Sequence, residues 1–140
     1  MTASESDVVR VVIVDDSSNI RAALTALLDT VPPTEVVGTA ATGQEGVDVV
    51  LETRPDVVVM DMQMPPGMDG ISASRIILES WPGAQILMNS AYSDQSLQAE
   101  AAGYGVKGYL SKDLRPAKLV AAIVALGQLA KSSEAATSLS

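Results

Sequence analysis

Short aliphatic runs alternate with segments of helical periodicity along this chain. Each run is rich in β-branched or aliphatic residues and ends in polar residues, which is typical of strands buried on both faces of a sheet. The runs cover residues 8–14, 35–38, 56–60, 85–88 and 106–110. Between and after them, apolar residues recur at spacings of three and four, which predicts helices. The predicted order is therefore a strand followed by a helix, repeated five times.

This alternation with short connections predicts an α/β fold, in which a parallel sheet is covered by helices on both faces. Five units fit a flavodoxin-like, doubly wound (βα)5 sheet of strand order 2-1-3-4-5, whereas a closed eight-unit barrel needs roughly twice the length. We expect one domain over residues 8–130. Residues 1–7 are expected to be a disordered N-terminus, and residues 131–140 a flexible tail or the start of a linker.

The composition narrows the chemistry open to such a domain. The 140 residues include no Cys and no His, which excludes thiolate metal sites, disulfides and histidine-based catalysis. A formal net charge of −8 argues against a nucleic-acid-binding surface on this domain. No apolar stretch approaches the roughly 20 residues that span a bilayer. We therefore expect a cytoplasmic protein with no membrane partner.

Polar residues with chemical potential stand at the carboxyl ends of four predicted strands. Ligands of open parallel sheets bind beyond these ends, where the strand order reverses. Here that point lies between the strand that ends at Asp15 and Asp16 and the strand that ends at Asp61. The last two strands bring Ser90 and Lys112 to the same edge. Any one of these residues alone is explained as a turn former or cap.

Together these residues predict a magnesium-assisted phosphoryl-transfer site. Three converging carboxylates repel one another unless a cation binds or their pKa values rise. Mg²⁺ is the obvious cation because it prefers oxygen ligands. A lysine and a hydroxyl would then face the oxygens of a phosphoryl group, and a carboxylate would serve as nucleophile or ligand.

The chain resembles the receiver domain of two-component response regulators over about residues 9–127. The matching motifs stand in the family's order, each at the end of a predicted strand. They are Val14-Asp15-Asp16, Met60-Asp61 followed by Met64-Pro65 and Met68-Asp69-Gly70, Asn89-Ser90-Ala91, and Gly108-Tyr109-Leu110-Ser111-Lys112. The Lys-Asp pair at residues 112–113 is common in the subfamily that carries a LuxR-type helix-turn-helix.

The resemblance implies how the acidic residues work. Asp61 would be the phosphoacceptor, forming an aspartyl phosphate. Asp16 and Asp61 would bind Mg²⁺, or Mn²⁺ in its place, together with the backbone carbonyl of Gln63. Asp15 would act on the metal mainly through water. Such a domain catalyses only its own phosphorylation and dephosphorylation, so it is a signalling phosphoacceptor rather than an enzyme with a separate substrate.

The resemblance also implies a switch and a set of partners. Lys112 would pair with Asp61 and then with the phosphoryl group, which Ser90 would also contact. Tyr109 would turn inward as the aromatic switch, although a half-buried strand aromatic is the simpler interpretation of this residue. The phosphodonor would be a histidine kinase or a phosphotransfer protein. A face formed by the fourth helix, fifth strand and fifth helix, about residues 93–129, would mediate homodimerisation or partner control.

Three features depart from the family's usual pattern. The loop over residues 64–70 carries one extra residue, assigned to Pro66. Asp113 stands where many receivers have proline, so we assume no cis peptide before it. Tyr92 lies two residues after Ser90 in the sequence, and we hypothesise that Tyr92 and Gln63 flank the path of the hydrolytic water and set the phosphoryl lifetime. An exposed aromatic on a partner surface is the alternative for Tyr92.

Two other functions remain open at this stage. A Mg²⁺-dependent hydrolase with an Asp nucleophile, such as a phosphatase, typically needs a second acid two residues beyond the nucleophile, but Gln63 stands there. A receiver-like docking module that is never phosphorylated is the other alternative. The complete set of Asp15, Asp16, Asp61, Ser90 and Lys112 argues against that degenerate module.

Overall fold

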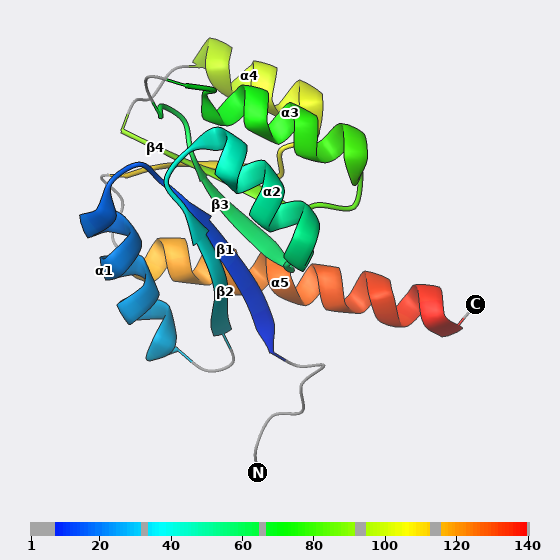
Figure 1. Cartoon of the computed structure of the whole chain (residues 1–140). Coiled ribbons are helices and arrows are strands. Elements are labelled where there is room, and N and C mark those ends of the chain that lie inside the picture. Colours follow the sequence, from blue (N-terminus) through cyan, green and yellow to red (C-terminus); the bar gives the residue numbers. More distant parts are fainter. Residues whose placement is uncertain (1–7, 32–33, 65–66, 92–94, 113–115, 140) are drawn as a thin grey trace.

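Five parallel strands form one sheet of order β2-β1-β3-β4-β5 in the computed structural model (Figure 1). The structure describes residues 8–31, 34–64, 67–91, 95–112 and 116–139, and for 132–139 the backbone alone. The strands are β1 (Val9–Val14), β2 (Thr34–Ala40), β3 (Val57–Asp61), β4 (Ile86–Ser90) and β5 (Gly108–Ser111). The helices are α1 (Ser18–Asp29), α2 (Gly43–Thr53), α3 (Gly70–Ser80), α4 (Gln95–Tyr104) and α5 (Pro116–Leu139). The predicted (βα)5 fold and strand order are confirmed.

Helices cover both faces of the sheet, because alternate residues of each strand point to opposite faces. On one face, Val12 and Val14 of β1 pack into a cluster with residues of α2 and α3. On the other face, Val11 and Ile13 pack into a second cluster with residues of α1 and α5. Figure 1 shows the same division, with α2, α3 and α4 on one side of the sheet and α1 and α5 on the other.

The central strands β1, β3 and β4 are buried on both faces, as the continuous apolar runs predicted. The same prediction is wrong for the two edge strands, because β2 is only partly buried and every residue of β5 is half-buried. An edge strand has a neighbour on one side only, so solvent reaches its free side. This difference leaves β5, which leads to Lys112, as the least buried strand beside the predicted site.

Side-chain caps begin three helices shortly after strand ends and thereby keep the connecting loops short. Ser17 accepts a hydrogen bond from a backbone N–H at the start of α1, at 3.3 Å, and Thr42 does the same for α2, at 3.1 Å. Asp69 caps α3, where its Oδ1 lies 2.7 Å from the amide nitrogen of Ser72. Each cap satisfies an N–H that lacks a partner within the helix. The loops that follow β1 and β3 are therefore anchored at both ends.

The last helix extends further than the sequence pattern predicted. α5 includes residues 131–139, which we expected to form a flexible tail. Five of the nine residues in 131–139 are good helix formers, namely two alanines, one leucine, one lysine and one glutamate, and the other four are serines and a threonine. The ammonium of Lys131 also pairs with Asp56 at 3.2 Å, which holds this part of α5 against the sheet. A role for 131–140 as a linker stays a prediction. No helix in the described ranges is both long enough and apolar enough to cross a membrane.

We predict that Gly127→Ala destabilises the domain, because α5 lies directly against β1 at this glycine. A Cβ on Gly127 would lie 2.3 Å from Cγ1 of Val9, which is itself buried. Relieving such overpacking typically costs about 1–3 kcal/mol. Urea unfolding should therefore show a lower free energy of unfolding than for the wild type.

Gly103→Ala is the matched control, since Gly103 is an exposed helical glycine with nothing within 4 Å of the added Cβ. Alanine there should stabilise α4 slightly, by about 0.5–1 kcal/mol. Equal effects of the two substitutions would show that α5 does not approach β1 this closely.

Candidate phosphorylation site

Three carboxylates gather at the carboxyl edge of the central strands. The parallel register places Val14 opposite Met60, so the residues that follow them, Asp15 and Asp61, come side by side. One carboxylate oxygen from each of Asp15, Asp16 and Asp61 lies within 4.8 Å of the others. Asp15 and Asp61 are only 2% and 5% exposed, whereas Asp16 is exposed. The structure thus brings together the acidic residues that the strand ends predicted.

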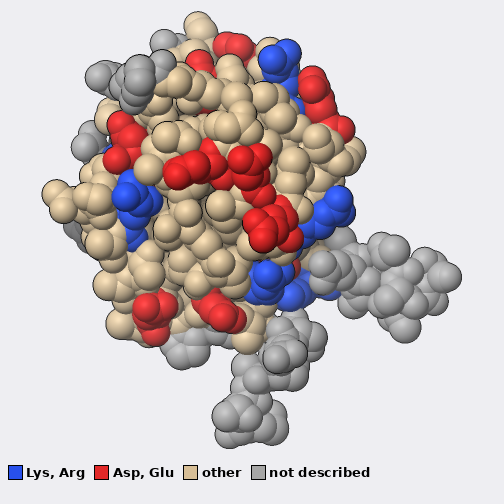
Figure 2. Space-filling model, viewed as in Figure 1, with Lys and Arg blue, Asp and Glu red and all other residues tan. Residues whose placement is uncertain are grey.

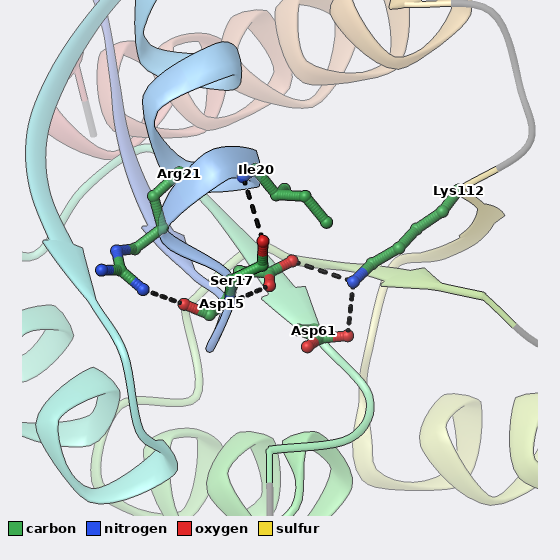
Figure 3. A network of polar contacts seen from close by, with 6 residues as sticks. All are labelled: Asp15, Ser17, Ile20, Arg21, Asp61 and Lys112. Atoms are coloured by element: carbon green, nitrogen blue, oxygen red, sulfur yellow. Dashed lines mark hydrogen bonds and ion pairs between the residues drawn. The ribbon is translucent and has the colours of Figure 1, made fainter.

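Lys112 joins the two buried carboxylates from the end of β5 (Figure 3). Its ammonium lies 3.0 Å from Oδ2 of Asp15 and 3.0 Å from Oδ1 of Asp61. Its backbone N–H donates to the carbonyl of Ser90 at 2.7 Å, which fixes the place where the side chain leaves β5. The contact with Asp61 is the one the family resemblance implied. The contact with Asp15 was not foreseen.

The environment shifts the pKa values of Asp61 and Lys112, which face each other. Burial raises the pKa of Asp61, and the neighbouring charges of Asp15 and Asp16 raise it further, against the lowering effect of the hydrogen bond from Lys112. Burial by itself lowers the pKa of Lys112, but its hydrogen bonds to both carboxylates outweigh this, so the pKa of Lys112 lies above its ordinary value. Lys112 is therefore a permanent cation at neutral pH.

The remaining contacts leave Asp16 as the carboxylate most open to a ligand. Oδ1 of Asp15 accepts the backbone N–H of Ser17 at 2.9 Å, while Oδ2 is taken by Lys112. The backbone N–H of Asp15 donates to the carbonyl of Ala40 at 3.0 Å. These contacts hold Asp15 from three sides. Asp16 is exposed, and one of its carboxylate oxygens lies within 4.8 Å of a carboxylate oxygen of Asp61.

Two glycines, whose structural role the sequence reasoning missed, hold the loop after Asp61. A Cβ on Gly70 would lie 2.0 Å from the carbonyl oxygen of Asp61, and a Cβ on Gly43 would lie 2.8 Å from that of Met68. The N–H of Gly70 also donates to the carbonyl of Met62 at 2.8 Å. The available signal was their position, since each glycine opens a helix directly after a capping residue. This loop carries Gln63, whose side chain is exposed.

The other residues implied by the resemblance lie in strands or outside the described ranges. Ser90 is fully buried at the end of β4, and Tyr109 is half-buried in β5 and packs against the cluster on the α2–α4 face. This placement agrees with the simpler interpretation of Tyr109 and leaves its switch role a prediction. Tyr92, Pro66 and the peptide before Asp113 lie outside the described residues, so the hypotheses about them stay predictions.

We predict that Asp61→Asn raises the thermal stability of the metal-free domain at neutral pH. A carboxyl whose pKa is raised by folding is less stable in its charged form in the native state, so stability falls as pH rises through that pKa. Removing the charge should recover about 1 kcal/mol, a few degrees in melting temperature, and Lys112 keeps its contact with Asp15. The gain should vanish in acid, where the wild-type carboxyl is protonated in both states.

The exposed Asp48 of α2 supplies the control, because Asp48→Asn should change the melting temperature little at any pH. Scanning calorimetry at several pH values compares the two variants with the wild type. A lower melting temperature for Asp61→Asn at neutral pH would contradict the proposed crowding.

Comparison with known proteins identifies the family to which this site belongs. The model of the response regulator receiver domain matches residues 11–124. A transcriptional regulatory protein of Bacillus subtilis strain 168, YhcZ, whose own role is uncharacterized, is 41% identical over 111 residues. That match covers 79% of this chain and 51% of YhcZ. The chain spans about half the length of the curated relatives it matches.

Solved structures agree with this assignment. A two-component response regulator of the LuxR family from Aurantimonas sp. SI85-9A1 superposes with a TM-score of 0.82 at 35% identity, over 86% of each chain. The CheX-CheY-BeF3-Mg+2 complex from Borrelia burgdorferi contains a chain that matches with a TM-score of 0.78 at 30% identity, over 84% of this chain and 88% of that one. The chain therefore belongs to the response regulator receiver domain family of two-component systems.

Proposed function

We propose that the domain is a switch controlled by phosphorylation of Asp61. The observation that carries this proposal is the cluster of Asp15, Asp16 and Asp61 with the ammonium of Lys112 between two of its members. In the proposed step, a carboxylate oxygen of Asp61 attacks the phosphorus of a phosphohistidine on a histidine kinase or phosphotransfer protein. The P–N bond breaks as the new P–O bond forms, and the imidazole leaves and takes up a proton.

The donor set fits Mg²⁺, or Mn²⁺ in its place. Three carboxylates and one ammonium carry a net charge of −2 when all are ionised, which a divalent cation would balance, and every candidate donor is an oxygen. Asp16, Asp61 and the backbone carbonyl of Gln63 are the proposed ligands, with Asp15 acting through water. A bound ion would neutralise charge that otherwise repels an incoming phosphoryl group. The magnesium named for the Borrelia burgdorferi complex supports this choice.

Lys112 and Ser90 are proposed to receive the transferred group. Before transfer, Lys112 balances the charge of Asp61 at 3.0 Å, and afterwards its ammonium can pair with a phosphoryl oxygen at nearly the same place. Because Lys112 follows β5 directly, this exchange of partners acts on the end of a half-buried edge strand. We propose that β5, with Tyr109, passes the change to the face formed by α4, β5 and α5 for dimerisation or partner control.

The output is proposed to lie outside this domain. On the face seen in Figure 2, Lys and Arg side chains are scattered among acidic ones and form no continuous basic patch. DNA binding, which the similarity to a regulator of the LuxR family suggests as an output, would thus belong to a further domain or to a separate partner protein. A cytoplasmic location stays a prediction. The hydrolase alternative gains no support, because exposed Gln63 is not an acid.

We predict that acetyl phosphate with Mg²⁺ adds one phosphoryl group to the wild-type protein, which intact-mass spectrometry would detect. Asp61→Asn should gain none, because an amide oxygen is a poor nucleophile. Removal of Mg²⁺ with a chelator should slow the wild-type reaction strongly. A protein that is never modified would instead be the docking module described above.

Asp69→Asn is the matched control, since it changes a carboxylate of the same loop but keeps an oxygen that can cap α3. This variant should be phosphorylated at the wild-type rate. Equal modification of Asp61→Asn and the wild type would reject Asp61 as the acceptor.

We also predict that Gln63 and Tyr92 set the lifetime of the aspartyl phosphate. Gln63→Ala and Tyr92→Ala should each change the rate of dephosphorylation by a factor of about 2 to 10, because a factor of ten in rate corresponds to only about 1.4 kcal/mol. The decay of phosphorylated protein after removal of the donor gives this rate. Gln128→Ala, at an exposed position of α5, should leave the rate unchanged. Unchanged decay in both site variants would reject the hypothesis.

A further inference from the structure

Arg21 makes a contact at the acidic cluster that neither the sequence motifs nor the proposed function assigns. Arg21 lies one turn into α1, where its N–H donates to the carbonyl of Ser17 at 3.0 Å. Its side chain turns back toward the start of the helix, and one guanidinium N–H donates to the main-chain carbonyl of Asp15 at 2.8 Å. Figure 3 shows Arg21 and Lys112 approaching Asp15 from opposite sides.

This carbonyl belongs to the peptide bond that links Asp15 to Asp16. A peptide is planar, so fixing the direction of its carbonyl also fixes the direction of its N–H and the start of the next residue. The N–H of Asp15 and both of its carboxylate oxygens have other partners. Arg21 holds the remaining polar group of Asp15. The backbone from which Asp16 projects is thereby set.

The position of the Asp16 carboxylate depends on its backbone more than the positions of the Asp15 and Asp61 carboxylates do. Asp15 and Asp61 are buried and paired with Lys112, whereas Asp16 is exposed. Among the described residues, no side chain is seen to hold the Asp16 carboxylate in place. The position of the Asp16 carboxylate therefore depends chiefly on the Asp15–Asp16 peptide.

The charge of Arg21 opposes the binding of a cation, so any favourable effect of Arg21 comes from its hydrogen bond. A guanidinium stays protonated at any pH at which the domain is folded. Because Arg21 binds a carbonyl and forms no ion pair with a described carboxylate, it occupies no carboxylate oxygen that a cation needs, although its own charge repels a cation.

We propose that Arg21 is a positioning residue for the cation site, which aims Asp16 by holding the carbonyl of Asp15. The proposal rests on the proposed function, because it assumes that the cluster binds Mg²⁺. Arg21 would not touch the phosphoryl group. It would therefore change the affinity for Mg²⁺ and leave the rate at saturating Mg²⁺ unaltered.

The test is titration calorimetry of the unphosphorylated protein with Mg²⁺. Arg21→Met keeps the apolar stem but removes the donor and the charge. The loss of the hydrogen bond should outweigh the removal of a repelling charge and weaken Mg²⁺ binding about tenfold, because a hydrogen bond that involves a charged group contributes about this much. Arg75→Met removes the same charge from an exposed position of α3 and should change the affinity less than about twofold. Equal affinities of Arg21→Met and the wild type, or equal losses in both variants, would overturn the proposal.

Arg21→Lys tests whether the loss of affinity in Arg21→Met comes from the lost hydrogen bond or from a folding defect. Lysine keeps a cationic donor on a long side chain. We expect it to recover part of the lost affinity, and an affinity as low as that of Arg21→Met would count against the proposal. Amide hydrogen exchange of the metal-free protein gives a second measurement. Exchange at Asp16 and Ser17 should be faster in Arg21→Met than in the wild type, and unchanged exchange would mean that Arg21 does not hold this peptide.

The kinetic consequence distinguishes the inference from the proposed function. In Arg21→Met, the Mg²⁺ concentration for half-maximal phosphorylation by acetyl phosphate should rise, while the rate at saturating Mg²⁺ stays within about twofold of the wild type. A lower rate at saturating Mg²⁺ with unchanged half-saturation would overturn the role of Arg21 alone. A wild-type protein that binds no Mg²⁺ would overturn the cation site as well.

Discussion

Crowding of carboxylates at the carboxyl edge of β1 and β3 is the constraint around which this domain is built. Asp15 and Asp61 are almost fully buried beside each other, and the charge of Asp16 lies close by. Such a group is unfavourable in the folded state, as the raised pKa of Asp61, caused first by its burial, indicates. The ammonium of Lys112 stabilises this group of carboxylates. The backbone of the paired strands β1 and β3 also keeps the carboxylates from moving apart. This unfavourable charge would favour the binding of a cation, which the proposed phosphoryl transfer requires.

The rigidity of this edge comes from residues outside the acidic cluster. Caps begin α1 and α3 close behind the acidic residues. Gly70 and Gly43 allow the starts of α3 and α2 to lie against the loop that follows Asp61, where any side chain would meet backbone oxygen. On the other side of the site, β5 is half-buried along its whole length. The site thus joins a rigid pair of strands to a strand that has fewer buried contacts and can adjust more easily.

The sequence predicts the fold and the acidic cluster well, and it does so for a physical reason. The alternation of apolar runs and helical spacing fixes a parallel sheet, and parallel strands bring their carboxyl ends to one edge. Asp15, Asp61 and Lys112 could be placed together on that ground alone. The exposure of β2 and β5 was missed, because a strand's position at the edge of the sheet changes its burial without changing its residues. The extent of α5 was missed as well.

Contacts between a side chain and a backbone carbonyl were beyond the reach of the sequence reasoning. Arg21 is an ordinary helix residue in the pattern, and only the path of the chain brings the carbonyl of Asp15 within 2.8 Å of it. The close approaches at Gly70 and Gly127 depend in the same way on how two elements pack. Such contacts carry no motif because a carbonyl is present at every residue.

A second buried carboxylate shows why burial alone does not mark a functional acid. Asp56, at the amino edge of the sheet, is 6% exposed and so about as buried as Asp61. Its Oδ2 accepts the backbone N–H of Arg10 at 2.8 Å and lies 3.2 Å from the ammonium of Lys131. In the part of the chain that the structure describes, Asp56 belongs to no cluster of three or more acidic residues. A neutral donor and a cation thus stabilise the charge of Asp56. The pair with Lys131 stabilises the packing of α5 against the sheet.

Asp61 differs from Asp56 in the kind of partners that surround it. Lys112 is its side-chain hydrogen-bond partner among the described residues, and that lysine is shared with Asp15. One cation therefore serves two buried acids, with a third acid beside them. A divalent ion would supply the missing positive charge, and a phosphoryl group would then bring in new oxygens for Lys112 to bind. The shared lysine, more than the burial of any one acid, is what distinguishes a site prepared for chemistry from a structural ion pair.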